Sequence, residues 1–111
     1  MNENLSKPER ELAKLKGFDI MKEDHGCMVM AGSFYYEGSS VQGIGYVINI
    51  DFVDRLMDVF RADRLQQING KSAWVTHDHS SIHKIEPLHA EDGITFDIKK
   101  WVDDCEKKRK K

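Results

Sequence analysis

The middle of the chain carries one strongly amphipathic helix pattern, and this feature limits the fold most. A helix is predicted from Asp51 to Arg61. Its apolar residues recur at spacings of three and four, as in Phe52, Leu56 and Phe60, while charged residues occupy the opposite side. Asp51 is placed to cap it. A helix of this length is marginal alone, so its apolar side must be buried against another layer.

Strand-like segments flank this helix on both sides. Gly32 indicates a bulge or a close backbone approach, and Pro87 predicts an edge strand. Strands and helices do not alternate regularly, so an antiparallel sheet is favoured over a doubly wound parallel sheet. The predicted strands lie within 25–36, 41–50, 73–77, 82–88 and 94–98.

Shorter helices are predicted at both ends of the chain. Ser6 and Glu9 have the spacing of a capping box, and Gly17 is a helix stop. Residues 101–108 are expected to form a short closing helix. The predicted fold is therefore α+β: an antiparallel sheet with one main amphipathic helix packed on a face, plus short N- and C-terminal helices.

The length of 111 residues fits one core. We divide the chain into an N-terminal helix at 1–17, a single α+β domain at 18–104 and a basic C-terminal tail at 105–111. The opening residues do not resemble a secretory signal, and a cytoplasmic location is expected. Two cysteines make no disulfide framework: Cys27 is expected to be a buried hydrophobe and Cys105 to lie on a surface helix.

Charge is unevenly distributed along the chain. The last five residues are all basic, and without them 12 basic residues face 19 acidic ones, a charge of −7. A body that acidic repels phosphate, so nucleic acid is not expected as a partner except through the tail.

Three histidines follow the strand predicted at 73–77. His77, His79 and His83 resemble the zinc-binding run Thr-His-x-His-x-Asp-His of metallo-β-lactamase-like hydrolases. That run needs an Asp-His pair where residues 81–83 are Ser-Ile-His, and that fold needs a longer chain with further ligands. The neighbouring histidines 77 and 79 are expected to be surface polar residues. No metal and no cofactor are therefore predicted.

A short Gly-rich segment after a polar turn is the candidate binding site. It lacks the third glycine and the strand–turn–helix context of a dinucleotide fingerprint. We favour close packing as the reason for its glycines and keep the close approach of a ligand as the alternative. The candidate ligand- or partner-binding residues are Ser39, Ser40, Gln42, Gly43, Gly45 and Tyr46.

Several motifs in this order resemble a family of small phage and prophage proteins of unknown function. The likeness spans roughly residues 20–101, and the members of this family share a pattern similar to the following segments of the chain. They are Glu23-Asp24-His25-Gly26, the run from Ser39 to Tyr46, the amphipathic helix, Ile68-Asn69-Gly70-Lys71, Ile85-Glu86-Pro87-Leu88 and Gly93-Ile94-Thr95-Phe96. The resemblance implies a phage or prophage gene product acting in the cytoplasm of a bacterial host, and it carries over no catalytic residues.

The leading hypothesis from the sequence is a non-enzymatic binding protein, with counter-defence as its role. Its partner would be a host protein or a small, nucleotide-like signalling ligand, with no membrane involved, and a homo-oligomer is compatible with the sequence. Two alternatives stay open. One is a metal-dependent hydrolase that uses the histidines 77, 79 and 83, and the other is a nucleic-acid-associated regulatory protein that uses the basic tail.

Overall fold

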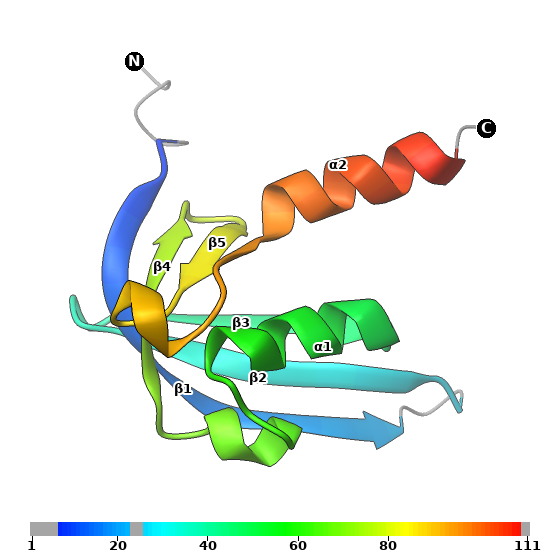
Figure 1. Ribbon diagram of the computed structural model, residues 1–111, viewed down its shortest axis with the longest axis horizontal. Helices are drawn as coiled ribbons and strands as arrows, with labels where there is room; N and C mark the ends of the chain where they lie inside the picture. Colours follow the sequence, from blue (N-terminus) through cyan, green and yellow to red (C-terminus); the bar gives the residue numbers. More distant parts are fainter. Residues whose placement is uncertain (1–6, 23–25, 110–111) are drawn as a thin grey trace.

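In the part of the chain that the structure describes, six antiparallel strands form a single sheet, accompanied by two α-helices (Figure 1). The computed structural model describes residues 7–22 and 26–109, and the backbone alone at 46, 47, 108 and 109. Across the sheet the strand order is β3-β2-β1-β4-β5-β6. The strands are β1 (Glu9–Lys22), β2 (Met28–Tyr36), β3 (Val41–Val47), β4 (Ser72–His77), β5 (Ile82–Glu86) and β6 (Phe96–Asp97). The predicted α+β class with an antiparallel sheet is confirmed.

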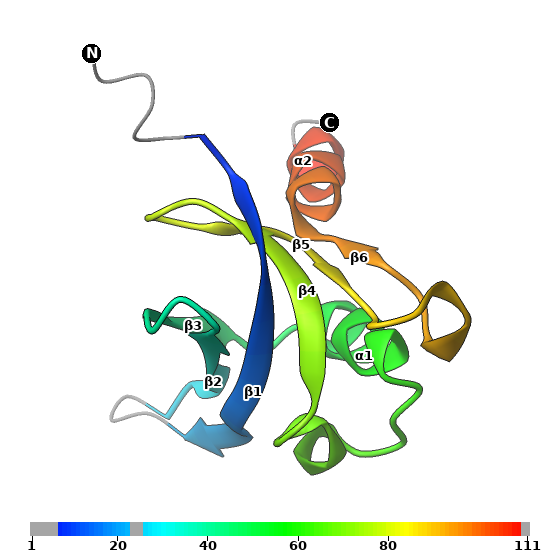
Figure 2. The same ribbon diagram turned by 90° about the vertical axis from the view of Figure 1, so that its left-hand side faces the viewer.

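The long strand β1 joins the two halves of the sheet. It pairs with β2 on one side and with β4 on the other, and Figure 2 shows β1 and β4 side by side. β2 and β3 continue the first half, while β5 and β6 continue the second. The connection from β3 to β4 contains α1 (Ile50–Val59) and a short 3-10 turn, η2 (Leu65–Ile68).

The predicted N-terminal helix is wrong, because the described part of it is strand β1. Ala13 and Leu15 are buried, whereas Lys14 and Lys16 between and after them are exposed. This alternation has the period of two that a strand requires, and it outweighs the sparse helical stripe. Ser6, the proposed helix cap, lies outside the described residues.

Gly17 marks a bulge in β1 and does not stop a helix. Its φ of 72° is in the region that favours glycine, and the pairing with β2 shifts register between Lys16 and Asp19. Next to the bulge, Phe18 lies against Gly32: a Cβ at Gly32 would overlap the Phe18 ring. The close approach predicted at Gly32 is therefore confirmed, and the bulge is in the neighbouring strand.

Helix α1 packs its apolar side against the sheet, as predicted. Phe52, Leu56 and Val59 are buried. The cap differs from the prediction: the Phe52 N–H donates to Asn49 Oδ1 at 3.2 Å. Asp51 lies in the first turn, where its carboxylate accepts from the Trp101 indole N–H at 2.7 Å.

The second half of the sheet ends in a short strand that leads directly into α2 (Ile98–Arg109). The C-terminal helix is thus twelve residues long and not the short 101–108 helix expected. β6 takes only two residues of the predicted 94–98 strand, yet it pairs with β5. β5 is therefore no edge strand, and Pro87 lies just beyond its end. A short 3-10 turn, η3 (Ala90–Asp92), connects β5 to β6.

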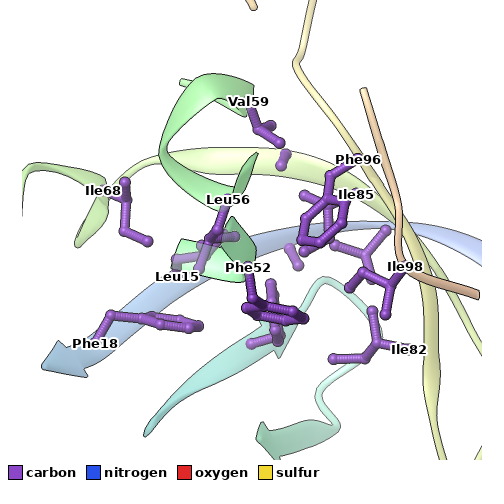
Figure 3. Packing of buried hydrophobic residues seen from close by; sticks show 14 of the residues in the cluster. Leu15, Phe18, Phe52, Leu56, Val59, Ile68, Ile82, Ile85, Phe96 and Ile98 are labelled. Carbon is purple, nitrogen blue, oxygen red and sulfur yellow. The ribbon is translucent and has the colours of Figure 1, made fainter. Parts of the chain in front are cut away.

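The core lies between α1 and one face of the sheet (Figure 3). Phe18 and Ile68 are at one end of the cluster, and Phe96 and Ile98 are at the other. Cys27 is exposed, so its predicted burial is wrong. Cys105, on α2, is partly exposed. Within the described ranges, no helix is long and apolar enough to span a membrane.

Candidate functional site

Polar side chains gather at one end of the sheet face that carries α1. Alternation places Glu11 on the same face as the buried Ala13, and His77 on the same face as the buried Val75. Tyr36 of β2 is paired with Ala13. Three neighbouring strands thus bring Glu11, Tyr36 and His77 together, and we call these residues with Gln42 of β3 the polar end.

A continuous set of contacts links the members of the polar end. His77 Nε2 is 2.8 Å from Glu11 Oε1, and the imidazole stacks on the Tyr36 ring with centroids 3.9 Å apart and planes at 9°. The Tyr36 hydroxyl donates to Gln42 Oε1 at 2.7 Å. Gln42 Nε2 in turn donates to the backbone oxygen of Asp78 at 3.3 Å. Tyr36 is 5% and His77 9% exposed, so these side chains are held in fixed orientations.

Burial sets the protonation state of the tyrosine. Desolvation, and secondarily the charge of Glu11, raises the pKa of Tyr36 well above its usual range. The phenol therefore stays neutral at physiological pH and remains a hydrogen-bond donor to Gln42.

A cavity of about 400 Å³ opens beside the polar end. Its wall includes Tyr36, Gln42 and His77 from the network, together with Glu9 and Ser40. This volume is within the range of small-molecule sites, and its lining combines aromatic rings with a few fixed polar groups. The arrangement can hold a small polar molecule through hydrogen bonds and stacking.

The turn between β4 and β5 is organised around a second carboxylate. Asp78 Oδ1 accepts from the backbone N–H groups of Ser80 and Ser81 at 2.9 and 2.8 Å, and Asp78 Oδ2 is 2.9 Å from His83 Nε2. These contacts, the Ser80 backbone first and the His83 ring second, hold the pKa of Asp78 well below its usual range. Asp78 therefore holds this turn, and His83 holds the Asp78 carboxylate.

The three histidines of the hydrolase alternative are divided between different surroundings. His77 belongs to the polar end, His83 is bound to Asp78, and His79 is an exposed residue at the cavity wall. A different donor set does converge. In the described part of the chain, one group of three or more donors is compact enough to share an ion: Glu9, Glu11 and His77, whose ligand atoms all lie within 4.8 Å of one another.

The structure divides the Gly-rich candidate residues as well. Ser40 and Gln42 line the cavity, whereas Ser39 adopts a positive φ of 79° in the β2–β3 turn. Gly43 and Gly45 are exposed on the edge strand β3, and a Cβ there would make only ordinary contacts of 3.8 and 3.7 Å. Close packing within the chain therefore does not explain these glycines.

The remaining sequence candidates are on residues that the structure does not describe in full. The side chain of Tyr46 is outside the described part, as are Glu23 to His25 of the first motif and the last residues of the basic tail. Lys107 of that tail is exposed at the end of α2.

Sequence reasoning missed Glu11 and Tyr36. It rejected His77 as a zinc ligand and expected a surface polar residue, which is wrong for His77, because only 9% of it is exposed. The signal for Glu11 was its period-two spacing with Ala13 and Leu15, which the helix prediction concealed. Comparison of the chain with family models, with curated proteins and with solved structures finds no match.

Proposed function

We propose that the protein is a non-enzymatic binding protein that takes a small polar ligand in the cavity beside the polar end. One observation carries this proposal: the cavity wall includes two buried side chains, Tyr36 and His77, whose orientations are already fixed by contacts with each other and with neighbouring residues. A preorganised site loses little conformational entropy when a ligand binds, and this favours affinity. The exposed Ser40 hydroxyl and the face of the aromatic stack offer recognition groups.

The charge of the cavity limits the chemistry of that ligand. Two carboxylates, Glu9 and Asp78, line the cavity, and a third, Glu11, contacts His77 of the cavity wall. Lys7 and His79 supply the basic groups of the lining. Carboxylates repel phosphate, so a neutral or cationic polar molecule is favoured over a free nucleotide.

The phage or prophage context implied by the motif resemblance gives this binding a role. Sequestering a small signalling molecule of the host would be a form of counter-defence, and it requires no catalytic group. A host protein as the partner is the less supported version, because the cavity is the size of a small molecule.

Mass spectrometry of small molecules that copurify from a bacterial host tests the proposal. We expect a compound retained by the wild type and lost from the double variant Ser40→Ala, Gln42→Ala. Gln66→Ala, an exposed glutamine on η2, is the matched control and should retain the compound. Equal retention by the double variant would remove this cavity from the binding site, and a copurifying host protein without a small molecule would favour the other partner class.

One observation favours a second candidate, a metal-dependent hydrolase. His77 lies beside two carboxylates at the wall of the cavity. The ligands in that case would be Glu9, Glu11 and His77 and not the three histidines.

A further inference from the structure

We propose that Glu9, Glu11 and His77 form a binding site for one divalent transition-metal ion, with zinc as the best fit. The inference goes beyond the proposed function, because an inorganic ion can bind whether or not an organic ligand does. It also replaces the expectation from the sequence that the protein holds no metal.

The strand register brings the three donors together. Glu9 and Glu11 are two residues apart on β1, so both side chains leave the same face of the sheet. His77 is the residue paired with Glu9 on the neighbouring strand β4. Two ligands of one zinc, each about 2 Å from the ion, are at most about 4 Å apart. Ligand atoms within 4.8 Å of one another need only a small side-chain rotation to close on an ion.

The histidine is already oriented as a metal ligand. Its ring is held against Tyr36, with 9% of the residue exposed, and its Nε2 points to the Glu11 carboxylate. An ion inserted between Nε2 and Oε1 would replace one hydrogen bond with two coordination bonds, and the proton of that hydrogen bond would be released to solvent. The Tyr36 hydroxyl donates to Gln42, so the ring that stacks on His77 is itself held and keeps the imidazole in this orientation.

Charge and donor type indicate the kind of ion. The two carboxylates beside the imidazole carry a negative charge that a divalent cation neutralises. Imidazole nitrogen favours zinc, iron and related ions, whereas Mg²⁺ and Ca²⁺ prefer an all-oxygen set. One nitrogen and two carboxylates therefore select a zinc-like ion over Mg²⁺.

The site is open on one side. Glu9 and His77 both line the cavity, so a fourth coordination position faces that space. Three protein ligands with one open position are the arrangement of zinc sites that accept an exchangeable water or ligand, whereas structural zinc sites have four protein ligands. The cavity could then supply a water or the polar group of a bound molecule.

Direct metal binding tests the proposal with the full chain, without an affinity tag. After treatment with a chelator, Zn²⁺ is titrated in by calorimetry, the bound metal is counted by elemental mass spectrometry, and Co²⁺ reports its ligands by visible absorption. We expect one Zn²⁺ per chain, weak or no binding of Mg²⁺, and at least 10-fold weaker zinc binding by Glu9→Gln and by Glu11→Gln.

Matched variants separate this site from adventitious binding by surface histidines. His83→Ala removes a histidine held by Asp78 and should leave zinc affinity within about twofold, whereas His77→Ala should abolish stoichiometric binding. If His77→Ala fails to fold, Glu9→Gln decides alone, because its side chain is exposed and its loss should leave the fold intact. The proposal is overturned if the wild type binds no stoichiometric zinc, or if Glu9→Gln and Glu11→Gln bind it as tightly as the wild type. Neither result depends on an organic ligand.

Discussion

The two ends of one face of the sheet are buried in different ways: side chains at one end are apolar, and those at the other end form a hydrogen-bonded polar network. Where α1 covers the face, Leu15, Phe34 and Leu56 are fully buried and make no polar contacts through their side chains. Further along the same strands, Tyr36 and His77 are almost as buried, yet both carry polar groups that are bound to neighbours. Buried side-chain nitrogen and oxygen atoms without a hydrogen-bond partner do not occur among the described residues.

This difference shows what each end is suited for. Apolar burial stabilises the fold without selecting a ligand, because it is non-directional. A satisfied polar network contributes less net stability per contact, but it fixes hydrogen-bonding groups in space. The helix-covered end is thus suited to stabilise the fold and the polar end is where we propose recognition, and mutations should separate the two.

The largest effect is expected at the helix-covered end. Leu56→Ala should lower the free energy of unfolding by about 2–5 kcal/mol, because it leaves a cavity in a fully buried position. Denaturant unfolding measures it. Arg55→Ala, on the exposed side of the same helix, is the control and should change stability by less than about 0.5 kcal/mol. A similar small change for Leu56→Ala would contradict the packing of α1.

The next largest effect concerns two glycines on paired strands. Gly32→Ala should destabilise by about 1–3 kcal/mol, because its methyl group would overlap the Phe18 ring. Gly43→Ala should stay within about 0.5 kcal/mol, since its methyl group would have room. Thermal unfolding of both variants tests the contrast, and equal losses would show that β3 is packed more tightly than described.

At the polar end the expected cost is smaller. Tyr36→Phe keeps the ring stacked on His77 and removes only the hydroxyl that donates to Gln42, so the loss should be about 1 kcal/mol. Tyr35→Phe is the control on the opposite face, where 43% of the residue is exposed, and should change little. If Tyr36→Phe were as damaging as Leu56→Ala, the division between the two ends would not hold.

The last prediction concerns the direction of a pH dependence. The pKa of Asp78 is lowered in the folded protein, so its carboxylate stabilises the fold above the ordinary aspartate pKa of about 3.9. That contribution is lost as the pH falls below this value towards the folded pKa. Asp78→Asn should therefore be less stable than the wild type at pH 7, and the difference should shrink in acid.

Melting temperatures between pH 7 and pH 3 measure this effect. Ser80→Ala removes a hydroxyl donor but keeps the backbone N–H, so it should retain most of the pH dependence. A difference between Asp78→Asn and the wild type that grows in acid would reverse the assigned sign.

The sequence predicts the local elements well and the long-range ones poorly. The period of the apolar residues locates α1, and β-branched residues locate β2 to β5, because both signals are contained within a dozen residues. The sequence did not predict β1 as a strand, because Ala13 is a small residue with a weak apolar signal and Leu12 falls at a helical spacing from Leu15. Ser40 and Gln42 could be proposed from turn chemistry. Glu11, Tyr36 and His77 come together because of the register in which β1 pairs with two other strands. No local sequence pattern encodes that register.

The central position of β1 also has a consequence for folding kinetics. β2 and β3 form a hairpin, as do β4 and β5, and such local pairings form early at little loop-closure cost. The β1–β4 pairing instead brings side chains such as Glu11 and His77 into contact, although they are 66 positions apart in the chain. Contacts between residues so far apart in the sequence slow folding, so the β1–β4 pairing should form late. The residues that line the cavity lie on both sides of the β1–β4 pairing. A nascent or partly unfolded chain that lacks this pairing would therefore hold no ligand there. The proposed binding at this site would therefore report on completion of the whole fold.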